Sequence, residues 1–571
     1  MQKKGIIALL LAVLMIVSLA ACNGGSTSST SEPAPASSSE APADSSEAPA
    51  EGSETPADSS EETPVATGAI SYPMETEASI RYWKPISGDL IRKEGISSDN
   101  QTKFAENLQA LTGVKIEFVN PPVNTDQEQF NLLLASGDMP DIMEIDWLRK
   151  YPAGPDDAIA KGLVYDFTDQ INELAPDFLS TIQGIEGLEK KFKTDGGRFW
   201  GMGMIRETPL MGVWRGPVIR TDLLEELGLD KPETIEEWDT TLRAFKDAGV
   251  EVPLTFAGGN AGAINELLEY GLFCAWGAKP GIYLDDAGKM VYGPIEAGFK
   301  DTLLLLRGWY ADGLLDKNSF TNTNTEYNAL MGGGRAGATN GNTGGGIGAW
   351  TPVLEENVEG GKLEATLYPT QNKGERAMFG QKEPNFYEAY IVACVNPKSA
   401  YVEDCVKLLN YGYTDEGNIF YNYGLEGESW EGMTAEGYPD MMDAVDKAPD
   451  NKAEWSYYAR SPYNGPMVQN EGYIRQLLVL PTQVEAMEIW DQTDMDKYQL
   501  PPVTQSVDEG KEYSKIYQGV EDYYKEFTAK YILGEVPEDA FENEFVPTVQ
   551  GMDIQTCLDL RQAALDRYNA R

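Results

Sequence analysis

The stretch that decides the fold runs from IRYW at 80–83 to DIMEI at 141–145. Both ends are short apolar runs of the β type, and a third run of this kind covers 114–119. Two segments with a helical spacing of apolar residues separate them, one ending at Gly113 and the other covering 130–135. Strand, helix, strand, helix, strand is an order typical of parallel sheets. The sequence therefore predicts an α/β fold.

Aromatic and polar residues follow two of these predicted strands directly. Trp83 ends the first run, and Asp146 and Trp147 come immediately after the last one. Ligands of open α/β sheets bind beyond the carboxyl ends of the strands. We therefore expect these three residues at the edge of a ligand cleft.

A second alternation of helices and strands begins after residue 220. A helix is predicted over 221–227, and TIEEW at 234–238 begins with a capping box, in which Thr234 and Glu237 satisfy each other's backbone amides. A hairpin with an Asp/Gly turn is predicted at 282–291. Because 571 residues are too many for one compact core, this alternation indicates a second α/β lobe.

Further elements are expected toward the end of the chain. We predict strands at 197–202 and 387–395, a helix at 400–411, and helices from about 506 and over 554–570. The last helices have acidic polar faces, which suits packing onto the lobes better than binding to a membrane.

The segment 329–350 is rich in glycine. It contains no GxxxxGK[ST] pattern, so it is not a phosphate-binding loop of that kind. We expect a short strand followed by a loop that is lined by backbone. Asn340 and Asn342 lie beside glycines that allow close approach of a ligand, and Trp350 follows them toward the cleft.

The N-terminus has the pattern of an export signal. Lys3 and Lys4 precede an apolar run over 6–19, which is too short to span a bilayer. LAAC at 19–22 resembles the lipobox of bacterial lipoproteins, in which the cysteine is lipidated and becomes the first mature residue. This resemblance implies a signal peptide over 1–21, a lipid anchor on Cys22, and a location at the outer face of the cytoplasmic membrane.

Residues 22–70 contain Ser, Pro, Ala, Glu and Thr in abundance and no Lys, Arg or aromatic residue. Such a segment cannot bury enough apolar surface to offset the entropy of ordering. Its acidic residues repel each other and its prolines stiffen it. We therefore expect a disordered acidic tether between the anchor and a folded domain over 71–571.

Composition excludes several classes of function. The formal charge of −46 repels phosphate backbones, so we expect no nucleic-acid partner. The chain has no histidine, which removes Ser-His-Asp, Cys-His and histidine-zinc chemistry. No calcium-loop or zinc-type cysteine spacing occurs, and we expect neither metal nor cofactor. Apart from Cys22, the cysteines are expected to be buried small hydrophobic residues, although export would permit disulfides.

Several segments resemble one known family. LLLASGDMPDI at 132–142, TIEEW at 234–238 and WYADGLLD at 309–316 resemble motifs of extracellular solute-binding proteins of the sugar ABC-transporter class. VNPKSA at 395–400, YTDEG at 413–417, YGLEGESW at 423–430 and ALDRY at 564–568 extend the match. Together they resemble the LplA-like lipoprotein branch of family 1, from about residue 80 to the end of the chain.

The resemblance implies a two-lobed periplasmic-binding-protein-like (type II) fold with a hinge and a cleft. The first lobe would be about 78–208 plus 388–440, and the second about 212–382 plus much of 441–571. Hinges would lie near 206–214 and 383–389. Such a protein would be a monomer that captures an oligosaccharide-type solute by hinge closure, delivers it to ABC permease subunits in the membrane, and has no catalytic residues.

Neutral sugars need aromatic faces for their C–H surfaces and fixed polar groups for their hydroxyls. Strand ends, predicted hinges and the glycine-rich segment supply such residues, and Trp430 belongs to a motif of the resemblance, where it could equally be a packing residue. The candidate ligand-binding residues are Trp83, Asp146, Trp147, Arg206, Glu207, Trp214, Arg215, Asn340, Asn342, Trp350, Tyr387, Glu388 and Trp430.

Two alternatives stay open at this point. A surface glycoside hydrolase needs two carboxylates and no histidine, and some pair among 91 acidic residues will have a suitable spacing by chance. The same fold could also bind a peptide or another non-sugar solute, or act as the partner of a membrane sensor.

Overall fold

The computed structural model describes residues 69–151, 153–257, 268, 270–383, 391–460 and 465–571. The predicted signal peptide, Cys22 and nearly all of the predicted tether lie outside the described residues, as do Tyr387 and Glu388. Within the described part of the chain, no helix is both long enough and apolar enough to cross a membrane.

The predicted strand-helix alternation at the start of the folded part builds a four-stranded sheet. Its order is β11 (Ile391–Val395), β3 (Ile142–Asp146), β1 (Ser79–Trp83) and β2 (Lys115–Val119). Strands β2 and β3 pair with β1 in parallel, as predicted, whereas β11 returns antiparallel to β3. The carboxyl ends of β1, β2 and β3 therefore share one edge, and we call the elements around this sheet the first lobe.

Two helices connect these strands, and each ends at a glycine. Helix α1 (Lys103–Thr112) is capped by Thr102 and stops at Gly113, and α2 (Asp126–Ser136) stops at Gly137. Gly113 has a φ of +76°, and a Cβ there would lie 2.3 Å from the carbonyl oxygen of Met74. Only glycine fits that turn, so the predicted end of the first helix is enforced by local geometry.

The chain returns to the first lobe after β11. Helices α14 (Val402–Asn410), α15 (Asp415–Tyr423) and α17 (Asn451–Tyr458) pack there, together with the hairpin β12 (Trp430–Met433) and β13 (Pro439–Met441). Strand β14 (Val468–Gln469) pairs with β4 (Ile205–Arg206). The remaining helices of this lobe are α3 (Trp147–Lys150), α4 (Gly154–Ala160), α5 (Ile171–Leu174), α6 (Pro176–Gln183), α7 (Leu188–Phe192), α16 (Asp443–Asp446) and α18 (Glu471–Leu477).

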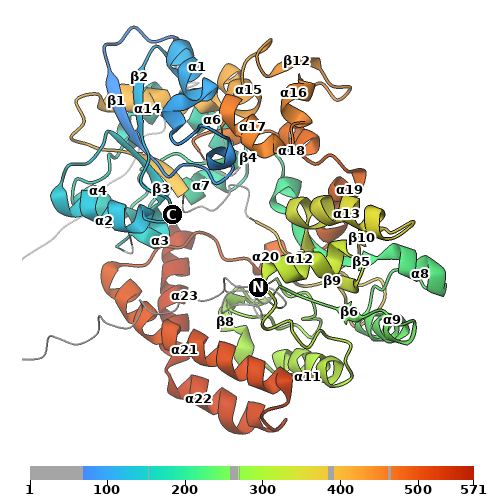
Figure 1. The fold of residues 1–571 in the computed structure, drawn as a ribbon. Coiled ribbons are helices and arrows are strands. Elements are labelled where there is room, and N and C mark those ends of the chain that lie inside the picture. Colours follow the sequence, from blue (N-terminus) through green and yellow to red (C-terminus); the bar gives the residue numbers. More distant parts are fainter. Residues whose placement is uncertain (1–68, 152, 258–267, 269, 384–390, 461–464) are drawn as a thin grey trace, which may run out of the picture. The chain divides into compact units, whose positions relative to one another are not determined.

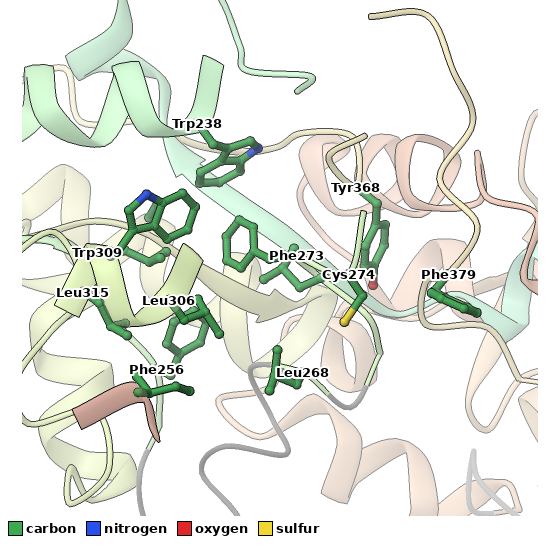
Figure 2. Packing of buried hydrophobic residues seen from close by; sticks show 14 of the residues in the cluster. Trp238, Phe256, Leu268, Phe273, Cys274, Leu306, Trp309, Leu315, Tyr368 and Phe379 are labelled. Carbon is green, nitrogen blue, oxygen red and sulfur yellow. The ribbon is translucent and has the colours of Figure 1, made fainter. Parts of the chain in front are cut away.

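A second four-stranded sheet has the order β10 (Leu363–Ala365), β5 (Arg215–Arg220), β9 (Ala336–Asn342) and β6 (Val252–Leu254). Only the β6–β9 pair is parallel. Trp238, Phe273 and Trp309 meet edge to face in the core beside this sheet, with ring centroids 5.4 and 4.9 Å apart (Figure 2). We call the elements around this sheet the second lobe.

Helices α8 (Thr221–Leu227) and α9 (Ile235–Asp247) begin the second lobe as predicted, and α9 opens with the predicted capping box of Thr234 and Glu237. The predicted hairpin consists of β7 (Ile282–Leu284) and β8 (Met290–Tyr292). The other helices of this lobe are α11 (Ala297–Ala311), α12 (Asn324–Gly332), α13 (Ala349–Asn357), α19 (Pro481–Trp490), α20 (Met495–Tyr498), α21 (Val507–Leu533), α22 (Val546–Gly551) and α23 (Ile554–Ala570) (Figure 1).

Two expectations about local structure are wrong. The segment 197–202 forms only single bridges, Lys193 with Phe199 and Met202 with Ala393, and no strand. The residues after β9 are not a loop but a π-helical turn that leads into α13, because the Asn342 side chain accepts a hydrogen bond of 2.7 Å from the amide of Gly346 and caps the turn.

All four cysteines of the described residues are buried thiols without disulfides, as expected from their scattered positions: Cys274, Cys394, Cys405 and Cys557.

Candidate ligand-binding site

A pocket of about 390 Å³ opens at the carboxyl edge of the first sheet. The loop after β1, the last residues of β3, the first residue of β11 and the helices beside them supply its walls. The lining residues are Pro85, Ile86, Ser87, Gly88, Asp89, Arg92, Asp126, Glu144, Ile145, Asp146, Lys150 and Ile391. The pocket thus lies beyond the carboxyl ends of the parallel strands, where ligands of open α/β sheets bind.

Both cations of the pocket wall are held by carboxylates. The Arg92 guanidinium donates to Asp450 at 2.8 and 3.1 Å and pairs with Asp89 at 2.9 Å. Lys150 pairs with Asp126 at 2.6 Å. These ion pairs fix the loop after β1 to helix α17 and fix α3 to α2, so they give the pocket wall a defined shape.

Asp146, which we expected at the edge of a ligand cleft, lines the pocket. Its Oδ1 accepts a hydrogen bond of 3.0 Å from the amide of Arg149, and its Oδ2 lies 3.3 Å from the Arg149 guanidinium. Burial raises the pKa of the Asp146 carboxyl above its usual value, despite these contacts. The carboxylate is thus positioned by the first turn of α3 and can still accept hydrogen bonds from a ligand in the pocket.

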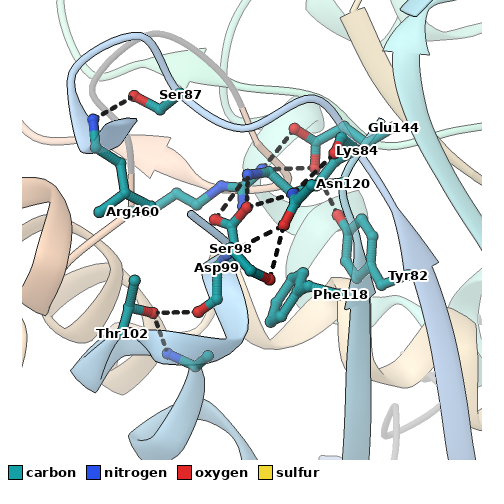
Figure 3. Close-up of polar contacts among 12 residues, drawn as sticks. Tyr82, Lys84, Ser87, Ser98, Asp99, Thr102, Phe118, Asn120, Glu144 and Arg460 are labelled. Carbon is teal, nitrogen blue, oxygen red and sulfur yellow. Dashed lines mark hydrogen bonds and ion pairs between the residues drawn. The ribbon is translucent and has the colours of Figure 1, made fainter. Parts of the chain in front are cut away.

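A buried polar network lies beneath the pocket (Figure 3). Glu144, which is 2% exposed, accepts a hydrogen bond of 2.6 Å from the Tyr82 hydroxyl and two from the Arg460 guanidinium, one of them at 2.7 Å. Arg460 follows α17 and is 316 positions away from Glu144 in the chain. This pair therefore joins the returning segment to the floor of the pocket.

The second half of the network anchors the loop after β1. The Lys84 ammonium donates to both oxygens of Asp99, at 2.8 and 2.9 Å, and Asn120 donates to Asp99 at 2.6 Å and to the Lys84 carbonyl at 3.0 Å. Burial alone would raise the pKa of Asp99, but the charges of Lys84 and Arg460 outweigh burial and lower it. Lys84 immediately precedes the pocket wall, so the ion pair holds the start of that wall in place.

Three of the predicted tryptophans are not available to a ligand in this structure. Trp83 and Trp147 are 3% and 2% exposed, and both rings pack against Phe130 from α2. Trp350 is also buried, meets Tyr327 edge to face, and donates a hydrogen bond of 2.8 Å to Asn328. Each ring turns under a neighbouring helix, and this placement in the core corrects the expected position on a cleft surface.

Trp430 is likewise a packing residue. It is buried beside Tyr423 and Trp455, and its indole donates to the carbonyl of Gly424 at 3.2 Å. Trp214, in contrast, is only partly buried. Its ring lies between Tyr270, at 5.9 Å, and the guanidinium of Arg215, at 5.6 Å.

The other candidates lie outside the pocket wall. Arg206 is buried on β4, and Glu207 accepts a hydrogen bond of 2.7 Å from the amide of Glu471. Asn340 is buried on β9, where its carbonyl accepts from Tyr327 at 3.0 Å, and Asn342 caps the following turn. Among the predicted site residues that the structure describes, which exclude Tyr387 and Glu388, only Asp146 lines this pocket.

The two segments that cross between the lobes touch each other at Gln381. Its side-chain amide donates to the carbonyl of Gly212 at 3.0 Å, and its oxygen accepts from the amides of Trp214 and Arg215 at 2.7 and 3.2 Å. Glu383 adds a backbone hydrogen bond of 2.9 Å to Gly212. These contacts join the first crossing, after β4, to the second crossing, which leads back to β11.

Sequence reasoning missed most of the pocket. Asp89, Arg92, Asp126 and Lys150 come from loops and helix ends, where spacing carries little information. Glu144 had one available signal, because it is a charged residue between the apolar residues Met143 and Ile145 of a buried strand.

Comparison with known proteins gives one family. The model for bacterial extracellular solute-binding proteins matches residues 97–419, more than half of the chain. Among curated proteins, Lipoprotein LipO of Bacillus subtilis (strain 168) is 25% identical over 252 residues, which is 42% of this chain and 47% of LipO. The fructooligosaccharide ABC transporter substrate-binding protein FusA of Streptococcus pneumoniae is 23% identical over 278 residues, 45% of this chain and 48% of FusA.

The chain thus matches about half the length of these curated relatives. Among solved structures, the alginate-binding protein AlgQ2 superposes with a TM-score of 0.66 at 22% identity, over 86% of this chain and 99% of AlgQ2. That likeness establishes the two-lobed α/β fold and nothing about the ligand. The family match covers β2, β3 and β11 of the first sheet and all four strands of the second, and the chain belongs to the bacterial extracellular solute-binding proteins.

Proposed function

We propose that the protein captures an oligosaccharide outside the cytoplasmic membrane and hands it, unchanged, to the permease subunits of an ABC transporter. The observation that carries this proposal is the pocket at the carboxyl edge of the first sheet, in a chain of the solute-binding family. Relatives named for fructooligosaccharide and alginate binding support the choice of an oligosaccharide.

The pocket has the chemistry that sugar hydroxyls require. Asp146 and Asp89 offer carboxylate oxygens. The loop over 85–89 also lines the cavity and places its backbone groups beside it. Hydrogen bonds to ionised acceptors are stronger than those between neutral groups. The ion pairs that hold these carboxylates in position also mean that they need little reorganisation when a ligand enters.

Capture would occur by closure of the lobes about the crossing segments. The hydrogen bonds of Gln381 hold the two crossings to each other and would let them turn as one pivot. A ligand that contacts both lobes stabilises the closed state and shifts the population toward it. The closed state would then present a surface that the permease recognises.

Attachment to the membrane would come from lipidation of Cys22, with residues 22–70 as the tether. The acidic, proline-containing composition of that segment favours an extended spacer. The anchor would keep the binding domain near its transporter and the tether would let the domain reach it.

A thermal-shift screen of the full-length protein tests this proposal. Oligosaccharides and matched oligopeptides are added in excess, and the incubated sugars are analysed by chromatography. A ligand that binds the folded state raises the melting temperature. We expect a shift with at least one oligosaccharide and no breakdown product. Shifts with peptides alone would overturn the assigned ligand class, and hydrolysis of a sugar would overturn the assignment as a binding protein.

A further inference from the structure

We infer that the captured solute is an uncharged oligosaccharide and that the pocket selects against sugars that carry carboxylates, such as uronates. This inference rests on the proposed function and makes it more specific. The fold alone leaves the choice open, since the similar proteins include one named for fructooligosaccharides, which are neutral, and one named for alginate, which is a polyuronate.

The first argument comes from the cations of the pocket wall. A uronate needs a positive charge that is free to pair with it, usually an arginine in a bidentate arrangement. Arg92 already has this arrangement with Asp450 and also contacts Asp89, and Lys150 is in contact with Asp126. Among the described lining residues, each cation is thus neutralised by a carboxylate of this chain.

The second argument comes from the cations beneath the pocket. Lys84 and Arg460 are both buried, and their charges could reach a ligand only through the pocket floor. The Asp99 carboxylate neutralises the Lys84 ammonium, and the Glu144 carboxylate neutralises the Arg460 guanidinium. Figure 3 shows these two ion pairs, and because the charges within each pair cancel, the pairs offer no net positive charge to an anion.

The third argument is the excess of acid in the wall. Asp89, Asp126 and Asp146 line the pocket beside Glu144, whose charge Arg460 balances, and the described lining cations are only Arg92 and Lys150. Asp146 contacts the guanidinium of Arg149, which does not line the pocket and is more than half exposed, and the charge of nearby Lys150 also acts on it. An anionic ligand would meet a repulsive field here, and the repulsion acts most strongly on groups that leave water.

A neutral sugar meets none of these obstacles. Its hydroxyls can donate to carboxylate oxygens whose remaining lone pairs are free, and it breaks no existing ion pair. Its entry also leaves the charge balance of the pocket floor unchanged. The same arrangement that excludes a uronate therefore favours hydroxyl donors.

Isothermal titration of the full-length protein tests the inference. The probes are neutral fructo-, gluco- and galacto-oligosaccharides, and oligogalacturonates and alginate oligomers of matched length. We expect neutral oligosaccharides to bind at least about tenfold more tightly than the uronates, a ratio that corresponds to about 1.4 kcal/mol. We also expect the affinity for the neutral ligand to stay constant with added NaCl, since no ligand ion pair is there to be screened.

A charge-releasing variant sharpens the test. Asp126→Asn leaves Lys150 without its carboxylate and should raise the affinity for uronates severalfold, with an increased salt dependence. The matched control is Asp508→Asn, which removes one negative charge from a fully exposed side chain on α21 and should leave uronate affinity as it is. Asp89→Asn, which removes a carboxylate beside Arg92, is the second variant if Asp126→Asn does not fold.

The outcomes separate the two proposals. Tighter binding of uronates than of neutral sugars overturns the inference and leaves oligosaccharide capture intact. If Asp126→Asn, Asp89→Asn and Asp508→Asn all bind uronates with the same affinity, the inference is also overturned. In that case the pairing of the lining cations would not control uronate binding. Binding of neither sugar class overturns the proposed function itself.

Discussion

Replacing Arg460 by methionine should destabilise the first lobe strongly. Methionine keeps much of the length and apolar volume of the arginine side chain but removes its charge and its hydrogen bonds to Glu144. Glu144 is 2% exposed, so water cannot replace the lost donors. The Tyr82 hydroxyl would be the only hydrogen-bond donor left to this carboxylate among those described here.

The magnitude follows from the cost of an uncompensated buried charge. Breaking one partner of a buried ion pair costs about 3–5 kcal/mol, far more than the net value of the intact pair. The ratio of folded to unfolded molecules should therefore fall by at least about a hundredfold. If Glu144 is also changed to glutamine, no charge is left unpaired, so the double variant should lose less than the sum of the two single losses.

Urea unfolding, followed by tryptophan fluorescence, measures these free energies. The matched control is Arg335→Met, since Arg335 pairs with Glu251 where both side chains are more than half exposed. Exposed pairs contribute about 0–1 kcal/mol. The reasoning is refuted if Arg460→Met costs no more than Arg335→Met, or if the losses in the double-mutant cycle simply add.

Three further predictions concern packing, the crossing segments and acid stability. Gly216→Ala should destabilise the protein by about 1–3 kcal/mol in thermal unfolding, because the new Cβ would lie 2.4 Å from the Trp490 ring. The control Gly308→Ala lies on α11, where a Cβ would meet nothing within 4 Å, and it should stabilise the protein by about 0.5–1 kcal/mol. Gln381→Ala should cost about 1–3 kcal/mol in urea unfolding, since the amides of Trp214 and Arg215 lose their acceptor, while the Gly212 carbonyl keeps its bond to the Glu383 amide. An unchanged midpoint would contradict the role of Gln381 in holding the crossings together. The lowered pKa of Asp99 favours its ionised form, so Asp99 contributes stability above a pH of about 4 that is lost as the pH falls through its folded pKa. The free energy of unfolding should therefore fall less steeply at acid pH in Asp99→Asn than in the wild type. Parallel curves would argue against the lowered pKa.

Local signals in the sequence predicted the elements well because the physics of those elements is local. The glycine that ends α1 and the capping box that opens α9 act within a few residues, so the sequence alone reveals them. The parallel pairing of β1, β2 and β3 could also be anticipated, since alternating helices and strands have few compatible topologies, whereas the antiparallel pairing of β11 with β3 was not predicted. The predicted strand at 197–202 failed because its pairing partners are single residues elsewhere in the fold.

The candidate site was harder to predict because it depends on side-chain direction and on distant partners. Trp83 ends β1 and Trp147 directly follows β3, but their rings pack on Phe130 of α2. Glu144 could be noticed as a charge in an apolar strand, yet nothing in the sequence points to Arg460 as its partner. The position of these residues along the strands could be predicted from the sequence, but the exposure of their side chains to the cleft could not.

Equilibrium dialysis with recovery of the ligand tests the central claim most directly. The full-length protein is dialysed against the oligosaccharide that gives the largest thermal shift, and the retained sugar is released by denaturation and its chain length is analysed. The account predicts about one molecule of intact oligosaccharide per protein at saturation. If no sugar is retained, or if shortened products are recovered, the claim that the protein binds an oligosaccharide without cleaving it is contradicted.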